Sequence, residues 1–241
     1  IVLLSYYIAA INIEAVFDEI NGDDPYVPFE GIVLTDTFES TEHQETLDDA
    51  FFGTNDKRLK RQQKKPITAI IGNPPYSIGQ SSQNDNNQNI SYPRLDKRLA
   101  DTYVSKSNAG LTRGLYDSYV KAFRWASDRL KNHGMIGFVT NGNYINTNSA
   151  DGLRAGLYEE FNHLYIFNLR GDQRTLGEQS RREGGKIFGS GSRTPVAISI
   201  LVKDGSDSHE LHYHDIGDYL SQKEKLAIIS GFADISRLDW Q

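Results

Sequence analysis

The sequence predicts an α/β fold: a mostly parallel sheet with one antiparallel edge strand. The first observation is residues 68–71, a run that is apolar on both faces and therefore typical of a strand buried in a parallel sheet. The second is the alternation of strand-like and helix-like patterns between residues 31 and 202, because such alternation produces parallel sheets. The third is the connection between strands predicted at 164–169 and 195–202, which has no helical pattern and favours an antiparallel hairpin at one edge.

The first quarter of the chain contributes a helix, a short strand and a polar segment. Apolar residues at helical spacing predict a buried amphipathic helix over residues 1–20. Residues 31–35 are an apolar strand with Asp36 at its end. That carboxylate suits either a helix cap or a hydroxyl or amine of a nucleotide-like cofactor. The basic cluster between residues 57 and 65 is either a solvated helix face or a phosphate contact.

The elements after residue 76 have clear patterns of their own. Residues 77–90, rich in Gln, Asn and Ser, are expected to form a mobile loop beside any site at residue 73. Apolar stripes predict helices, and apolar runs predict strands. The helices are 115–130 and 152–161, and the strands are 135–140, 164–169 and 195–202. A polar, glycine-rich and basic loop fills 170–193, a polar edge strand is expected at 209–215, and the chain end is expected to be helical.

Composition limits the classes of function. The 241 residues, of which 38% are hydrophobic and 24% charged, suit one large domain with or without an appendage, and no apolar run approaches the about 18 residues of a membrane span. The chain has no cysteine, which excludes disulfides and thiolate metal sites and is typical of a cytoplasmic protein. The net charge of −6 argues against a free-standing non-specific DNA binder, so we expect any nucleic-acid contact to be local or supplied by another domain.

The tetrapeptide Asn73-Pro74-Pro75-Tyr76 follows the strand predicted at 68–71. The prolines end the strand and stiffen a loop at its carboxyl end, which is where open α/β sheets bind ligands. The Asn73 amide oxygen and the Pro74 carbonyl are two acceptors, and two acceptors suit an exocyclic amine with two protons to donate. Tyr76 adds a flat face for a ring. An amine held in this way is positioned for attack on an activated methyl group.

An Asn-Pro-Pro-Tyr motif after an apolar strand resembles the catalytic motif of the amino-methyltransferases, above all the N6-adenine DNA methyltransferases of restriction–modification systems. The order of elements over residues 31–204 is similar to the second half of a class I S-adenosylmethionine-dependent methyltransferase, a Rossmann-like fold. Within the family, the spacing looks most like that of type I-like or single-polypeptide restriction–modification enzymes. The resemblance implies S-adenosylmethionine as cofactor and an adenine flipped out of double-stranded DNA as substrate.

The resemblance also implies roles for individual residues. Asp36 matches the acidic position that meets the cofactor, and Asn73 would lie between cofactor and base. Asn73 and Pro74 would hold the adenine N6, with Pro75 stiffening the loop. Residues 186–196 look like the loop whose aromatic residue packs on the flipped base, so Phe188 and Tyr76 would enclose that base. The candidates for phosphate contacts are Arg181, Arg182, Lys186 and Arg193.

One family feature does not occur in this sequence. The glycine-rich cofactor loop and the strand before it have no counterpart, so we expect further residues before Ile1 and a fragment that binds cofactor poorly unaided. On this interpretation residues 1–204 are a partial catalytic domain, and 205–241 are an extension or the start of a following domain. Expected partners are DNA and the specificity, helicase or nuclease domains or subunits of a restriction–modification enzyme, with no membrane.

Other functions fit parts of the sequence. The same motif serves in enzymes that methylate a protein glutamine or an RNA base. A fragment without the cofactor loop would instead be a non-catalytic DNA-binding or assembly domain. A metal site built on His209, His212, His214 and Asp215 is a third alternative, because strand alternation places His212 and His214 on one face. We predict no metal, since a polar edge strand explains the same residues.

Overall fold

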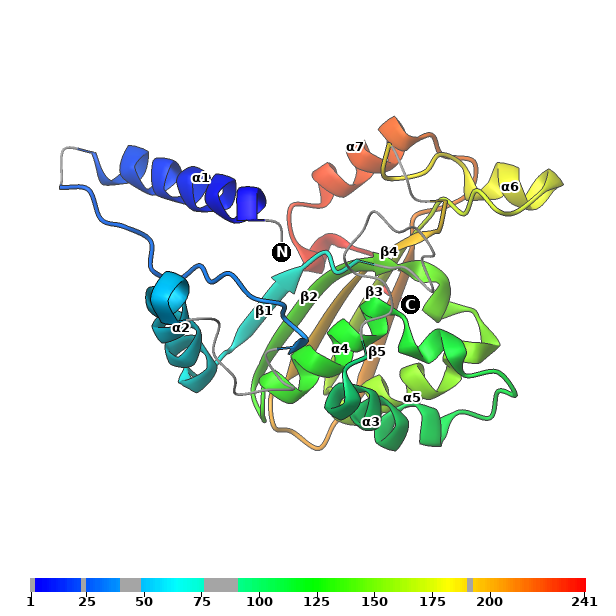
Figure 1. Ribbon diagram of the computed structural model, residues 1–241. Helices are drawn as coiled ribbons and strands as arrows, with labels where there is room; N and C mark the ends of the chain where they lie inside the picture. The colour runs from blue at the N-terminus through cyan, green and yellow to red at the C-terminus, as the bar shows by residue number, and fades with distance from the viewer. Residues whose placement is uncertain (1–2, 23–24, 40–48, 76–90, 190–192) are drawn as a thin grey trace. The chain divides into compact units, whose positions relative to one another are not determined.

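The computed structural model describes residues 3–22, 25–39, 49–75, 91–189 and 193–241 (Figure 1). The chain divides into two compact units, Ile1–Pro66 and Ile67–Gln241. The loop predicted over 77–90 lies outside the described residues. Among the described residues, no helix combines the length and apolar character needed to cross a membrane.

The first unit contains helices α1 (Leu3–Asn21) and α2 (Asp49–Lys64). The predicted first helix is confirmed, but the prediction that it is buried is wrong. No residue of α1 is buried, and Leu4 and Ile11 are 66% and 63% exposed. Apolar side chains occur around the whole helix, and the described part of this unit supplies no layer that covers them.

The strand predicted over 31–35 is not formed. The Leu34 N–H donates to the Asn55 Oδ1 at 2.7 Å, and the Asn55 amide donates back to the Leu34 carbonyl at 2.9 Å. A side chain of α2 therefore takes both backbone groups that a neighbouring strand would pair. An apolar run predicted a strand here, but a strand also needs a ladder partner.

The second unit is built on one five-stranded sheet. Its strands are β1 (Ala69–Gly72), β2 (Gly134–Asn141), β3 (His163–Arg170), β4 (Val196–Lys203) and β5 (Glu210–Asp215). The spatial order is β1-β2-β4-β3-β5. The pairs β1–β2 and β3–β5 are parallel, whereas β4 is antiparallel to both β2 and β3. Four strands thus run in one direction, and the predicted α/β sheet with one antiparallel strand is confirmed.

The positions of two strands differ from the prediction. β4 pairs with β3 as expected, but it lies inside the sheet and not at an edge. Ala197, Ser199 and Leu201 of β4 are completely buried, as an interior strand requires. β1, predicted to be buried, is instead an edge strand in which Ile71 is 82% exposed. A run that is apolar on both faces predicts a strand but does not specify its neighbours.

Helices cover both faces of this sheet. On one face lie α3 (Pro93–Thr102), α4 (Ser118–Arg129) and α5 (Asp151–Glu160) (Figure 1). Phe123 of α4 packs on Phe138 of β2, with ring centroids 5.3 Å apart. On the other face lies α7 (Gln222–Phe232), whose apolar residues pack against Phe167 and Leu169 of β3. The side-chain alternation of the strands therefore fills two cores, one on each face.

The end of the chain belongs to the same unit. The predicted edge strand is β5, which pairs with β3 from His163↔Glu210 to Asn168↔Asp215, and the predicted terminal helix is α7. The predicted boundary at residue 204 falls between β4 and β5 of one sheet. The loop between β3 and β4, predicted to be free of helix, contains the short helix α6 (Gly177–Glu183).

Candidate active site

The carboxyl ends of four strands meet at one edge of the sheet. β1, β2, β3 and β5 end there and β4 begins there, since β4 runs in the opposite direction. The Gly142 N–H, just after β2, donates to the Pro195 carbonyl, just before β4, at 2.8 Å. Ligands of α/β sheets bind at this kind of edge. The described residues to which the family resemblance gave roles, Asp36 excepted, lie in segments that follow or precede strands at this edge.

The Asn-Pro-Pro loop leaves the sheet at the end of β1. Gly72 pairs with Phe138, so Asn73 begins the loop beside the last residues of β2. Asn73 and Pro75 are exposed and Pro74 is half-buried. Among the described residues, the Asn73 side chain has no hydrogen-bond partner, so its amide can accept from a ligand. Tyr76 lies outside the described residues.

The end of β2 is held in a fixed turn. The Asn141 Oδ1 accepts from the Asn143 N–H at 3.0 Å. Tyr144, completing the turn, is buried, and its hydroxyl lies 2.6 Å from the Ser199 Oγ on β4. Burial raises the pKa of Tyr144 to about 12, so this hydroxyl is a structural hydrogen-bond partner and not an acid or base near neutral pH.

A residue that the sequence analysis did not single out links two loops of this edge. Arg174, in the loop after β3, donates to the Asn143 Oδ1 at 2.8 Å and to both carboxylate oxygens of Asp172. Burial alone would raise the pKa of the Asp172 carboxyl, yet the Arg174 side chain and N–H outweigh it and lower that pKa. The pair is thus fully charged at neutral pH. The only sequence signal was the number of arginines in this loop.

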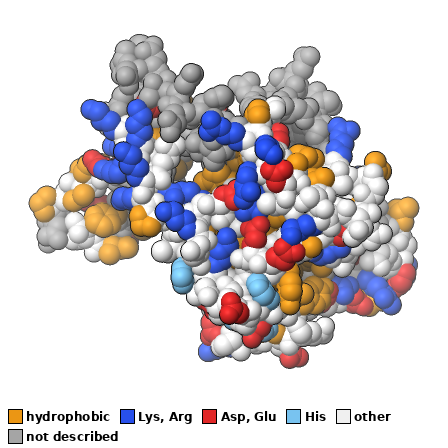
Figure 2. All heavy atoms as spheres, turned by 90° about the horizontal axis from the view of Figure 1, so that it is seen from below, with side chains coloured by type: hydrophobic (Ala, Val, Ile, Leu, Met, Phe, Trp, Pro, Cys, Tyr) orange, Lys and Arg blue, Asp and Glu red, His pale blue; other side chains and the backbone are white. Residues whose placement is uncertain are grey.

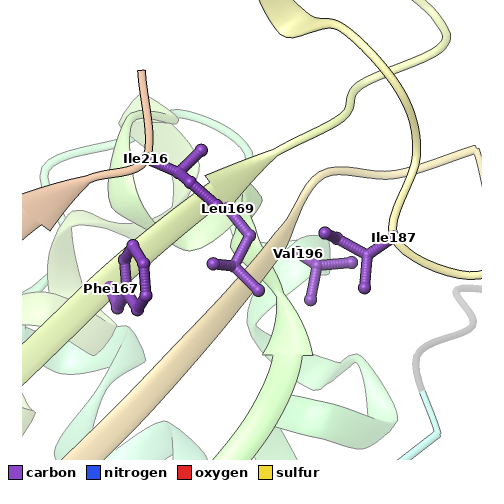
Figure 3. Close-up of a cluster of buried hydrophobic side chains, with 5 residues drawn as sticks. All are labelled: Phe167, Leu169, Ile187, Val196 and Ile216. Atoms are coloured by element: carbon purple, nitrogen blue, oxygen red, sulfur yellow. The ribbon is translucent and has the colours of Figure 1, made fainter. Parts of the chain in front are cut away.

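Phe188 lies on a hydrophobic cluster on the α7 face. The buried members of the cluster are Phe167, Leu169, Ile187, Val196 and Ile216 (Figure 3). Phe188 is only half-buried and packs against this cluster, as does Val139 of β2. Val139 follows Phe138, the partner of the last residue of β1, so the cluster reaches the strand beside Asn73. Ile187 is the buried anchor of the loop, whereas Phe188 remains partly exposed.

The predicted phosphate contacts differ in how they are held. Arg181 and Arg182 are exposed on α6, where Arg181 pairs with Glu178 at 3.5 Å and Arg182 with Asp218 at 3.9 Å. Exposed pairs at such distances are weak and exchange readily for phosphate. Lys186 is half-buried beside the cluster. Arg193 donates to the Gln173 carbonyl at 2.9 Å.

The face of the molecule shown in Figure 2 is not uniformly basic. On the face in Figure 2, the Lys and Arg side chains that are described are interspersed with Asp and Glu. Any binding of nucleic acid therefore depends on local groups, as the net charge of −6 predicts.

Asp36 belongs to the first unit. Its Oδ1 accepts from the Phe38 N–H at 2.9 Å and the Glu39 N–H at 3.3 Å. This geometry is that of a cap on a short turn, one of the two interpretations given by the sequence. The carboxylate is half-buried and held in one orientation, which also suits recognition of a ligand hydroxyl or amine.

The histidines proposed as an alternative metal site are engaged separately. His209 Nδ1 lies 2.9 Å from the Phe161 carbonyl, His214 Nδ1 lies 2.7 Å from the Asp239 carbonyl, and Asp215 pairs with Arg170. Near the starts of β3 and β5, His163, Glu210 and His212 do place three ligand-type atoms within 4.8 Å of one another.

That trio is explained by ion pairing. His163 Nε2 lies 2.9 Å from the Asp204 Oδ2, and its Nδ1 lies 3.2 Å from the Glu210 Oε2. The neighbouring carboxylates, Asp204 first and then Glu210, raise the pKa of His163, and this preference for the protonated ring opposes metal binding. The trio lies at the opposite edge of the sheet from Asn73.

The fold and the Asn-Pro-Pro edge together define a methyltransferase domain. Residues 5–174 match the family model described as "Eco57I restriction-modification methylase". This match covers more than half of the chain, so the chain belongs to the Eco57I restriction-modification methylases.

Three solved structures are similar over the whole chain. The nuclease-deletion mutant of the Type ISP restriction-modification enzyme LlaGI, in complex with a DNA substrate mimic, is 71% identical with a TM-score of 0.96. The ATP-dependent Type ISP enzyme LlaBIII bound to DNA is 51% identical with a TM-score of 0.93. DrdV in its DNA complex is 37% identical with a TM-score of 0.90.

The chain matches only part of each of these proteins. It spans 20% of the LlaGI chain, 16% of the LlaBIII chain and 23% of the DrdV chain. A comparison with curated protein sequences found no match. The similarity is therefore to one domain of much longer enzymes.

Proposed function

We propose that this chain is the catalytic and base-binding part of an enzyme that methylates N6 of adenine in double-stranded DNA. The observation that carries the proposal is the Asn73 amide. It is exposed at the ligand edge of the sheet and has no partner among the described residues, in a chain of the restriction-modification methylase family. An amide oxygen beside a proline carbonyl can accept both protons of an exocyclic amine.

The chain's own residues contribute positioning. The Asn73 Oδ1 and the Pro74 carbonyl accept the two N6–H bonds, which keeps the nitrogen lone pair directed at the electrophile. S-adenosylmethionine supplies an electrophilic methyl group when bound. On transfer of this methyl group to N6 the methyl–sulfur bond would break, with its electron pair remaining on sulfur. N6 would then lose one proton to solvent while Asn73 holds the other. Pro74 and Pro75, directly after Asn73, restrict the loop backbone, so little reorganisation is needed.

Two residues are candidates for contacts with the cofactor. The oriented, half-buried carboxylate of Asp36 fits a hydroxyl or amine of a nucleoside, and the Asn73 amide fits the region between nucleoside and base. They lie in different units of the chain, so each is proposed on its own geometry. Loss of Asp36 should weaken cofactor binding without changing the affinity for DNA.

The base must leave the helix to reach Asn73, because N6 is otherwise paired. Tyr76 and the accessible part of the Phe188 ring would enclose the flipped base. Arg181, Arg182, Lys186 and Arg193 come from the same loop as Phe188 and would contact phosphates on either side of it. The DNA complexes of LlaGI, LlaBIII and DrdV support DNA as the substrate. Their much greater length supports further domains in the same enzyme.

Methyl transfer from labelled S-adenosylmethionine tests the proposal. The native-length protein that contains this chain should label adenine in duplex DNA, and the 241-residue chain alone should label it weakly or not at all. Label on RNA or on a protein glutamine, with none on DNA, would identify a different substrate of the same chemistry. No label on any acceptor would favour a non-catalytic DNA-binding role.

A further inference from the structure

The start of α7 is bonded to the loop that carries Phe188. We call residues 184–189 the aromatic loop. The Gly185 N–H donates to the Leu220 carbonyl at 2.8 Å. The Gln222 Nε2 donates to the Ile187 carbonyl at 2.7 Å, one residue before Phe188. These bonds join segments more than 30 residues apart in the sequence, and they fix the backbone on both sides of Lys186.

The two segments approach so closely that only glycine fits. A Cβ added to Gly184 would lie 2.2 Å from the Leu220 carbonyl oxygen, and one added to Gly185 would lie 2.4 Å from the Gln222 nitrogen. Gly184 also has φ +66°, a conformation that side chains disfavour. Both glycines are therefore explained by backbone contact with the residues that lead into α7.

A buried lysine adds further bonds to the junction, by which we mean the contacts between α7 and the segment that carries Phe188. Lys225 is completely buried on α7, and its Nζ donates to the Leu169 carbonyl at 2.9 Å and to the Glu183 carbonyl at 2.7 Å. Burial lowers the pKa of Lys225 to about 8. Its two backbone contacts tie the end of β3 to the residue before the aromatic loop.

We propose that α7 forms part of the target-base site. Its Gln222 and Lys225 are positioning residues, which hold the aromatic loop and therefore Phe188 in place. The inference rests on the proposed function, because it assigns Phe188 a base to stack on. Apolar packing acts in the same direction, since Ile228, Ile229 and Phe232 of α7 lie on the cluster that anchors Ile187. An aromatic ring on a loop that is already fixed by hydrogen bonds loses less conformational entropy when it stacks on a base than a ring on an unrestrained loop does.

Hydrogen exchange tests the junction on this chain without any catalytic assay. Gln222→Ala removes one bond from an exposed side chain, so it leaves the fold intact. Lys225→Met keeps the length of the buried side chain and removes both of its contacts. Lys223→Met is the matched control, because Lys223 lies on the same helix and is exposed.

We expect the Gly184 and Gly185 amides, which donate to the Ser180 and Leu220 carbonyls, to exchange about fivefold faster or more in Gln222→Ala and Lys225→Met, the factor given by losing one ordinary hydrogen bond. In both variants, the exchange rates of the β2 and β4 amides should be unchanged. In Lys223→Met, the exchange rates should be unchanged throughout the chain. If Lys225→Met speeds exchange throughout the chain, the variant is generally destabilised, and the result for Gln222→Ala alone then tests the proposal. Unchanged exchange of the aromatic loop in Gln222→Ala would overturn the proposal.

Base trapping tests the link to function in the native-length protein. With 2-aminopurine at the target position, Gln222→Ala should reduce the fluorescence increase severalfold, and adding it to Phe188→Ala should have no further effect. Faster loop exchange with an unchanged fluorescence response would remove α7 from the site. If the unmodified protein gave no response, the proposed function would fail instead, and the exchange result would still stand for the junction.

Discussion

Arg174 bridges the loop after β3 to the turn after β2, donating to the Asn143 Oδ1 at 2.8 Å while it is paired with Asp172. Asn143 lies in the turn that Asn141 caps. Two loops of the ligand edge are therefore tied by one side chain whose charge is already balanced. The guanidinium suits this role because its donors point in several fixed directions.

Removing this bridge should weaken the site without unfolding the protein. We expect Arg174→Ala to lower kcat/KM for methyl transfer by about tenfold, the effect of one lost hydrogen bond to a charged group. Arg237→Ala is the control, since Arg237 is an exposed arginine whose one ion pair with a described residue is with Asp234. Equal kinetics for Arg174→Ala and Arg237→Ala would show that the bridge plays no part in the reaction.

The Asn73 amide should be essential to methyl transfer and dispensable for folding. We expect Asn73→Ala to reduce kcat by about a hundredfold or more, because a misplaced amine loses its alignment with the methyl group. The side chain is exposed and unbonded among the described residues, so the free energy of unfolding should change by less than about 0.5 kcal/mol. Asn132→Ala, at an exposed position before β2, should leave both quantities unchanged. Full turnover by Asn73→Ala would refute the mechanism.

Phe188 should act on the flipped base. Because the ring is half-buried, Phe188→Ala should cost less stability than the about 3–5 kcal/mol of a fully buried phenylalanine. It should nevertheless weaken trapping of an extrahelical base, measured with 2-aminopurine, while Phe188→Tyr retains the response. Leu176→Ala, at a position 87% exposed in the same connection, is the control. An unchanged response in Phe188→Ala would exclude the ring from the site.

Much of the second unit could be predicted from the sequence because its signals are local. The apolar runs placed β2, β3 and β4 to within one or two residues, and the two prolines marked the end of β1. Asn73 and Phe188 were recognised from short motifs. These features depend on residues that are neighbours in the chain.

The rest depended on contacts between distant segments. Nothing local indicates that β4 inserts between β2 and β3, or that Arg174 reaches Asn143 across 31 residues. The sequence placed Gly184 and Gly185 only in a glycine-rich loop, whereas the structure explains them by contact with Leu220 and Gln222. Residues 31–35 do not form the predicted strand for a related reason: the side chain of Asn55, 21 residues from Leu34 in the sequence, bonds the Leu34 backbone groups that a neighbouring strand would pair.

His163 should titrate above its ordinary pKa of 6.5, because Asp204 and then Glu210 stabilise the protonated ring. Its contribution to stability is complete below pH 6.5 and is lost as the pH rises through the raised value. Ring chemical shifts measured by NMR should therefore show a lower His163 pKa in Asp204→Asn, which removes the closer carboxylate. The nearby exposed Asp207→Asn should leave it unchanged. A His163 pKa of 6.5 or below in the unmodified protein would contradict this ion-pair assignment and reopen the trio with Glu210 and His212 as a metal site.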